Sequence, residues 1–269
     1  MRVIVTGANS GVGKATATAL AAAGHEVVIA CRTVSKGEAA AATMAGDVKV
    51  AHLDLADLAS VRRFAASIDF VDVLVNNAGV LALPLTRTAD GFEAHFGTNH
   101  LGHFALTCLL ADRIKDRVVA VTSGAFGLAN MHWDDLNWER RRYSKSAAYS
   151  ESKLANLLFV HELNSLGIKS YSADPGIVNS DITRDSGPIL RWSGTYIHPV
   201  IGQTPAKGAR PILEAVATEL PGGTYLAPRG LLHQWGRPTP VKLRRKACDP
   251  EAARRLWKIS AKLTGCDLV

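Results

Sequence analysis

Short runs of apolar, mostly β-branched residues alternate along the chain with longer segments in which apolar residues recur at helical spacing. The longer segments predict helices at residues 12–23, 58–68, 91–113, 148–165, 205–219 and about 250–263. The short runs predict seven strands, at residues 3–6, 26–31, 48–54, 71–76, 117–122, 168–173 and 223–227. Strands that are apolar on both faces and separated by helices are typical of a parallel sheet covered on both sides. The pattern therefore predicts a doubly wound α/β domain, with a parallel sheet of about seven strands flanked by helices.

Two stretches interrupt this alternation, at about residues 128–147 and 181–203. Each follows the carboxyl end of a predicted strand, where ligands bind in open α/β sheets. Because 269 residues fit one domain, we expect a single domain over residues 1–269 with these stretches as insertions on the substrate side. Their aromatic residues leave two interpretations open, an apolar substrate pocket or a cover for the core: His132, Trp133, Trp138, Trp192, Tyr196 and His198.

Composition narrows the class of protein. The chain has 47% hydrophobic and 20% charged residues, which is ordinary for a soluble globular protein. Its four cysteines stand at positions 31, 108, 248 and 266 without metal-ligand spacing, so we expect reduced thiols and no metal site. We find neither a secretory signal nor an apolar run of about 18 residues, and therefore expect a cytoplasmic protein without a transmembrane segment.

The net charge of +7 includes basic clusters at residues 140–142 and 242–246. No nucleic-acid-binding motif accompanies them, so we expect no nucleic-acid partner and favour a solvated basic surface. Peripheral contact with an anionic membrane surface is an alternative that the sequence leaves open.

A glycine-rich turn, Thr6-Gly7-Ala8-Asn9-Ser10-Gly11-Val12-Gly13, follows the first predicted strand and opens the first helix. Gly7 permits a tight turn, Gly11 lets the backbone approach a pyrophosphate, and Gly13 lets the helix pack close to the sheet. Free N–H groups at the helix start then face anionic phosphates. The first strand–turn–helix unit therefore predicts dinucleotide binding by Gly7, Asn9, Ser10, Gly11, Val12 and Gly13.

The end of the second predicted strand indicates which dinucleotide binds. NAD sites place an Asp or Glu there, whereas this strand ends in Cys31-Arg32-Thr33. A guanidinium can bind a 2′-phosphate in a bidentate way, and a carboxylate would repel it. Arg32 therefore predicts NADP(H), with Ser10 and Lys36 as further contacts; a solvated strand end is the alternative. The turns after the third and fourth strands add residues expected near the cofactor: Asp54, Leu55, Asn77, Ala78 and Gly79.

Tyr149 and Lys153 lie four residues apart on a predicted helix and hence on one face. A nearby ammonium favours phenolate, so we expect a lowered tyrosine pKa and a proton donor suited to neutral pH. Ser123 ends the fifth predicted strand, where its hydroxyl can hold a substrate oxygen against the tyrosine. Asn99 lies in a helical stretch that suits a polar side chain poorly, which is consistent with a bound water joining the lysine to solvent.

These motifs, in this order, resemble the short-chain dehydrogenase/reductase family over nearly the whole chain: TGANSGVG, NNAG, Asn99, Ser123, YSESK and Pro175-Gly176. The resemblance implies a Rossmann fold with Tyr149 as general acid/base and Ser123 as the residue that positions the substrate oxygen. It makes Lys153 the residue that tunes the tyrosine and binds the ribose, and Asn99 the anchor of a proton relay. It also implies cofactor contacts from Pro175, Gly176, Ile177 and Ser180.

A finer similarity points to the retinol dehydrogenase-like branch, in residues 30–32, 98–104, 134–137, 149–159 and 255–257. That branch acts on lipophilic alcohols and aldehydes such as retinoids. We therefore expect an NADP(H)-dependent oxidoreductase of CH–OH donors that interconverts an alcohol and a carbonyl, with a retinal-like or long-chain substrate. The alternative is a non-catalytic NADP-sensing regulatory protein. Relatives form dimer or tetramer contacts through the helix that carries Tyr149, so a homodimer or homotetramer is a further expectation.

Overall fold

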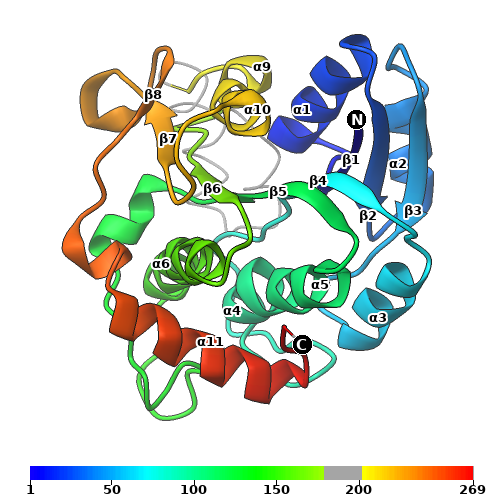
Figure 1. Ribbon diagram of the computed structural model, residues 1–269. Helices are drawn as coiled ribbons and strands as arrows, with labels where there is room; N and C mark the ends of the chain where they lie inside the picture. The colour runs from blue at the N-terminus through cyan, green and yellow to red at the C-terminus, as the bar shows by residue number, and fades with distance from the viewer. Residues whose placement is uncertain (179–201, 269) are drawn as a thin grey trace.

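The computed structural model describes residues 1–178 and 202–268, and its described strands form one sheet (Figure 1). The strand order is β3-β2-β1-β4-β5-β6-β7-β8, and only the β7–β8 pair is antiparallel. The order reverses between β1 and β4, the point at which open α/β sheets bind ligands. The bounds are β1 (Arg2–Thr6), β2 (Glu26–Cys31), β3 (Val48–His52), β4 (Val71–Asn76), β5 (Ile114–Val121), β6 (Ser170–Ala173), β7 (Tyr225–Pro228) and β8 (Pro238–Pro240).

Helices cover both faces of the sheet (Figure 1). One face carries α1 (Gly11–Ala22), α2 (Val34–Ala41), α9 (Pro205–Gly208) and α10 (Arg210–Ala217). The other carries α3 (Leu58–Ala66), α4 (Ala94–Phe96), the π-helix η1 (Gly97–Leu101), α5 (Gly102–Leu110), α6 (Lys145–Ser165) and α11 (Pro250–Thr264). Short 3₁₀ turns complete the described part of the chain: η2 (Gly124–Leu128), η4 (Leu231–His233) and η5 (Arg245–Ala247).

The central strands alternate between two hydrophobic cores. In β1, Val3 and Val5 pack with Leu20 of α1 and Ile212 of α10, whereas Ile4 faces the core of α3, α5 and α6. All three β1 residues are fully buried. Because a strand exposes successive side chains on opposite faces, a continuous apolar run is what a two-sided sheet requires.

The predicted fold class is confirmed; several element ends differ, and helix α2 and strand β8 were not among the predicted elements. The helix expected at residues 91–113 begins at Ala94, since Gly91 adopts a left-handed φ of 84° and Arg87 and Glu93 form an isolated β-bridge before it. The third strand ends at His52 rather than residue 54, and the fifth begins at Ile114 rather than 117. The antiparallel strand β8 was missed because its sequence, Pro-Thr-Pro, lacks strand character.

The buried hydroxyl of Thr6, at the end of β1, joins three segments that are distant in sequence. It accepts hydrogen bonds from the backbone N–H groups of Asn77 and Ala78, each at 2.9 Å. It also lies 2.9 Å from Nε2 of His103, whose Nδ1 faces the carbonyl oxygen of Asn99 at 3.0 Å. A carbonyl can only accept, so Nδ1 carries the proton and Nε2 accepts from Thr6. Burial lowers the pKa of His103 to about 4, which keeps the ring neutral in this role.

Within residues 1–178 and 202–268, no helix combines the length and the apolar character needed to cross a membrane.

We predict that Thr6→Val, which keeps the shape and removes the hydroxyl, lowers the free energy of unfolding by about 1–3 kcal/mol for each buried partner left unsatisfied. Urea unfolding at neutral pH measures this. The matched control is Thr16→Val, since Thr16 is equally buried and its hydroxyl only donates to the carbonyl of Val12 within helix α1. Equal losses of unfolding free energy in the two variants would show that the Thr6 hydroxyl stabilises the fold no more than a threonine hydroxyl bonded within one helix.

Candidate active site

Tyr149 and Lys153 lie one turn apart on α6, whose first turn is capped by the hydroxyl of Ser144. Lys153 is buried, and its Nζ donates to the carbonyl oxygen of Val121 at 3.1 Å. The same Nζ lies 5.7 Å from the centre of the Tyr149 ring. Tyr149 itself is half-buried.

Ser123 lies two residues beyond the end of β5, at the start of η2. Its hydroxyl accepts from the backbone N–H of Ala125 at 3.4 Å and lies close enough to the Tyr149 phenol to act on its pKa. The serine and tyrosine that the sequence singled out therefore meet, and a carbonyl oxygen held between two hydroxyl groups would be polarised and within reach of a proton.

The pKa values of the pair differ from the sequence-based expectation. Burial raises the pKa of Tyr149 to about 12; the hydroxyl of Ser123 opposes this and the carboxylate of Asp174 adds to it. Burial also lowers the pKa of Lys153 to about 8, although Asp174 works in the opposite direction. The expected lowering of the tyrosine pKa was wrong for this structure, because loss of solvation is the largest effect on the phenol. The pKa that is lowered is that of the lysine.

Asn99 lies in the π-helix η1, and both ends of its buried side chain are bound. Oδ1 accepts from the backbone N–H of Val80 at 2.7 Å, and Nδ2 donates to the carbonyl of Val80 at 3.1 Å and to the hydroxyl of Ser152 at 2.9 Å. The amide thus joins the turn after β4 to the helix that carries Tyr149 and Lys153. π-Helical turns are frequent at functional sites because the extra residue redirects side chains. The relay role of Asn99 stays a prediction.

The glycine turn leaves room that side chains would fill. Gly7 adopts a left-handed φ of 67°, and a Cβ there would lie 2.9 Å from Cα of Ala78. A Cβ on Gly13 would lie 2.4 Å from Nδ2 of Asn77. Around them stand the other expected residues of the turn: exposed Ser10 at the N-cap of α1, half-buried Asn9 and Val12, and Gly11 with φ 55°. This backbone cradle, with the first N–H groups of α1 beside it, suits a pyrophosphate.

The turn after β4 closes the cradle from the other side. Asn77 donates through Nδ2 to the carbonyl of Thr6 at 2.7 Å, and Thr6 holds the N–H groups of both Asn77 and Ala78. A Cβ on Gly79 would lie 3.3 Å from Oδ1 of Asn99 and 3.6 Å from Nζ of Lys153. The structure therefore brings this predicted cofactor segment against the predicted catalytic residues.

The adenosine side is more open. Arg32, directly after β2, is exposed and forms no ion pair with any described residue. Asp54 is half-buried, and its carboxylate accepts from the N–H of Ala56 at 2.9 Å. Leu55 is buried against Gly102, where a Cβ would lie 2.4 Å from the Leu55 carbonyl oxygen. These residues lie at the carboxyl edge of β2 and β3, the edge at which adenosine is expected.

The predicted nicotinamide-side segment follows β6. Gly176 has φ 70°, and a Cβ there would lie 2.5 Å from the carbonyl oxygen of Gln234. Gln203 bonds to both sides of this glycine, donating through Nε2 to the carbonyl of Pro175 at 2.6 Å and through its backbone to the carbonyl of Ile177 at 2.9 Å. Ser180 lies outside the described residues, as do Trp192, Tyr196 and His198.

The insertion at residues 128–147 is held to the far side of α6. Arg141 pairs with Glu151 through both guanidinium nitrogens at 2.7 Å, and His132 lies 2.8 Å from the same carboxylate. The guanidinium stacks 3.5 Å from the centre of the buried Trp138 ring. Trp138 is therefore part of the buried interior, whereas His132 is exposed, and Trp133 packs on the third core cluster with Arg255 beside it.

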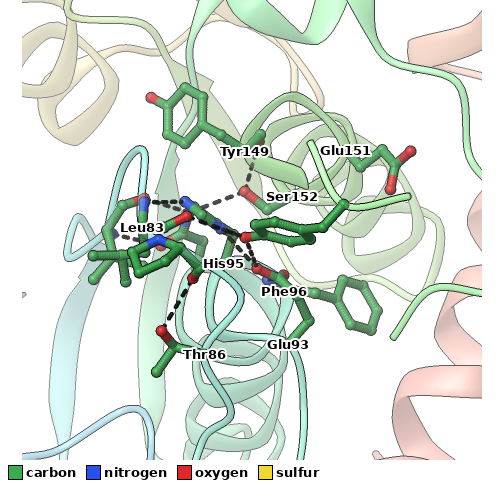
Figure 2. A network of polar contacts seen from close by, with 12 residues as sticks. Leu83, Thr86, Glu93, His95, Phe96, Tyr149, Glu151 and Ser152 are labelled. Carbon is green, nitrogen blue, oxygen red and sulfur yellow. Dashed lines mark hydrogen bonds and ion pairs between the residues drawn. The ribbon is translucent and has the colours of Figure 1, made fainter. Parts of the chain in front are cut away.

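A buried polar network, not foreseen from the sequence, lies beside Tyr149 (Figure 2). Glu93 accepts from His95 at 2.7 Å, from the phenol of Tyr143 at 2.9 Å and from the backbone of Phe96 at 2.8 Å. Burial works to raise the pKa of Glu93, but these hydrogen bonds outweigh it and hold the pKa below its ordinary value. The His95 ring meets the Tyr149 ring edge-on, with 6.3 Å between centres. Figure 2 shows Ser152 turned toward this network and Glu151 turned away from it.

Several of these residues were missed although the sequence held a signal for them. His103 stands four residues after Asn99 on an otherwise apolar helix, which indicates a shared polar face. Asp174 places a charge directly after a buried strand. The described residues contain no group of three or more His, Cys, Asp or Glu side chains placed to hold a metal ion.

Comparison with known proteins assigns the family. The family model described as short chain dehydrogenase matches residues 1–189. Human retinol dehydrogenase 13 is 42% identical, over 98% of this chain and 85% of that protein. Human retinol dehydrogenase 12 is 40% identical, over 98% of this chain and 86% of that protein. The crystal structure of an uncharacterized protein from Mycobacterium paratuberculosis is 45% identical with a TM-score of 0.87, covering 100% of this chain and 94% of that one. The chain therefore belongs to the short-chain dehydrogenase/reductase family, in its retinol dehydrogenase-like branch.

Proposed function

We propose that the protein is an NADP(H)-dependent oxidoreductase that interconverts an alcohol and a carbonyl, with a lipophilic, retinal-like or long-chain substrate. One observation carries the proposal. Tyr149 lies beside Ser123 and beside buried Lys153, whose Nζ is also adjacent to Gly79 of the predicted cofactor segment. The cradle and the acid–base group thus share one edge of the sheet.

The residues divide the chemistry as follows. NADPH, when bound, supplies the hydride for the carbonyl carbon. The hydroxyl of Ser123 holds the carbonyl oxygen, and that of Tyr149 gives it a proton as negative charge develops there. The ammonium of Lys153 stabilises the negative charge left on the phenol oxygen. In alcohol oxidation each proton moves in the opposite direction, so the same residues serve both reactions.

The preference for NADP(H) is supported by charge at the end of β2. Arg32 is exposed there and no carboxylate occupies the strand end, so a 2′-phosphate would meet a free guanidinium. Asn9, Ser10, Gly11, Val12 and Gly13 would hold the pyrophosphate, and Pro175, Gly176, Ile177 and Ser180 the nicotinamide side.

The substrate class is supported by the names of the relatives, both retinol dehydrogenases. The alternative, a non-catalytic NADP-sensing regulator, finds no support among these relatives, and Tyr149 and Lys153 are both present in catalytic spacing. A homodimer or homotetramer stays a prediction.

We predict that Tyr149→Phe lowers kcat for NADPH-dependent carbonyl reduction by about 10²–10⁴-fold, because the proton donor is lost. NADPH oxidation is followed by absorbance with retinal, long-chain aldehydes and short aldehydes. Tyr171→Phe is the matched control, since its phenol only donates to the carbonyl of Leu220. A Tyr149→Phe enzyme with a tenth or more of the wild-type rate would remove the tyrosine from the mechanism.

We predict that Arg32→Ala raises the KM for NADPH at least tenfold and leaves the KM for NADH nearly unchanged. A tenfold change corresponds to the loss of about one charge-assisted hydrogen bond. The control Arg254→Ala removes another exposed arginine, on α11 far along the chain. Equal effects on the two cofactors would mean that Arg32 does not read the 2′-phosphate.

We predict that carbonyl reduction is fastest below about pH 7 and declines as the pH rises through about 8. The pKa of Lys153 is lowered to about 8, so its ammonium, the form used in reduction, is lost above that pH. The test is kcat/KM measured from about pH 6 to 10, with circular dichroism showing that the fold persists. A rate that stays constant to about pH 10 would mean that Lys153 keeps an ordinary lysine pKa in the working enzyme.

A further inference from the structure

Asp174, directly after β6, is a buried acid that the proposed reaction does not use. Its Oδ1 accepts from the backbone N–H of Gly176 at 2.8 Å, and its Oδ2 from the phenol of Tyr225 at 2.8 Å. The backbone N–H of Gly124 also favours the ionised carboxylate, and a Cβ on Gly124 would lie 3.5 Å from Oδ2. An unpaired carboxylate in such a place would be costly, and these three donors offset the loss of water.

The three donors belong to different parts of the site. Gly124 is the neighbour of Ser123 at the end of β5, and Gly176 lies in the segment expected beside the nicotinamide. Tyr225 comes from β7, on the other side of β6. The Asp174 carboxylate therefore links the turn that follows β5 and the segment that follows β6 to strand β7.

The charge of Asp174 also acts on the catalytic pair. It raises the pKa of Lys153 and of Tyr149, opposing burial at the lysine and adding to it at the tyrosine. Burial raises the pKa of Asp174 itself, while the hydrogen bonds and the Lys153 charge favour its ionised form. Tyr225, the remaining ionisable partner, has its pKa raised by burial and by Asp174, so it stays a donor.

A neutral side chain of the same shape would not do both tasks. Asparagine offers one acceptor oxygen, and its amide nitrogen would face a donor N–H or a phenol that now donates. Only a carboxylate accepts on both oxygens and carries negative charge.

We propose that Asp174 is a positioning residue of the active site: its carboxylate holds the Ser123–Gly124 turn and the Pro175–Ile177 segment in register, and its negative charge stabilises the ammonium of Lys153. This inference deepens the proposed function and rests on it.

The test compares Asp174→Asn with Tyr225→Phe, which removes one hydrogen bond and leaves the charge. Lysine labelled with ¹³C at Cε, titrated by NMR, reports the ionisation of Lys153 without any substrate; the signal is assigned by its loss in Lys153→Met. We expect the pKa of Lys153 to fall from about 8 to about 7 in Asp174→Asn and to stay in place in Tyr225→Phe.

In the same variants we expect kcat for NADPH-dependent reduction to fall at least tenfold in Asp174→Asn and less in Tyr225→Phe, with the alkaline limb of the pH profile displaced only in Asp174→Asn. An unmoved Lys153 titration in folded Asp174→Asn would overturn the proposal, as would an equal displacement in Tyr225→Phe. If Asp174→Asn does not fold, Asp174→Glu decides. Glutamate keeps the charge and displaces the carboxylate oxygens, so kcat should fall tenfold while the alkaline limb of the pH profile stays in place. A wild-type kcat in Asp174→Glu would overturn the proposal.

A wild-type protein that turns over no carbonyl would count against the proposed function alone. The NMR titration measures the link between Asp174 and Lys153 independently of turnover.

Discussion

The hydroxyl group of Thr6 sets the geometry on which the site depends. It occupies the point where the strand order reverses, between β1 and β4, and accepts from two backbone N–H groups of the turn that follows β4. His103 extends the contact to the π-helix that carries Asn99. Without this joint, the turn after β4 would lack a fixed position relative to the glycine cradle, because loop backbone is ordered only where its polar groups are bound.

Burial of Lys153 creates the second constraint. An ammonium removed from water destabilises the protein unless donors and charges are arranged around it. Here the carbonyl of Val121 and the carboxylate of Asp174 stabilise the ammonium. They do not fully offset the loss of water, so the pKa of Lys153 is lowered to about 8. The group that changes charge most readily around neutral pH is therefore the lysine, whereas the tyrosine remains a phenol.

Much of the fold followed from sequence, because each apolar run of the central sheet is long enough to be buried on both faces. The Tyr149–Lys153 pair and the glycine turn were equally accessible, since their spacing is fixed within one helix or one loop. The contacts between distant segments could not be predicted from the sequence. Nothing local shows that Glu93, His95 and Tyr143 meet, that Tyr225 donates to Asp174, or that Arg141 pairs with Glu151. These contacts depend on the packing of elements far apart in the chain. The tyrosine pKa was misjudged for the same reason: spacing indicates a neighbouring charge but not the depth of burial.

The contact between Gly13 and Asn77 has an evolutionary consequence. The amide of Asn77 occupies the space that a side chain at position 13 would need, and the same amide holds the end of β1. A larger residue at position 13 would displace that amide and loosen the strand end, and its Cβ would also lie 2.8 Å from the backbone carbonyl oxygen of Gly7. A change at position 77 could relieve only the first of these contacts, so position 13 should remain glycine in lineages of this protein even where position 77 varies.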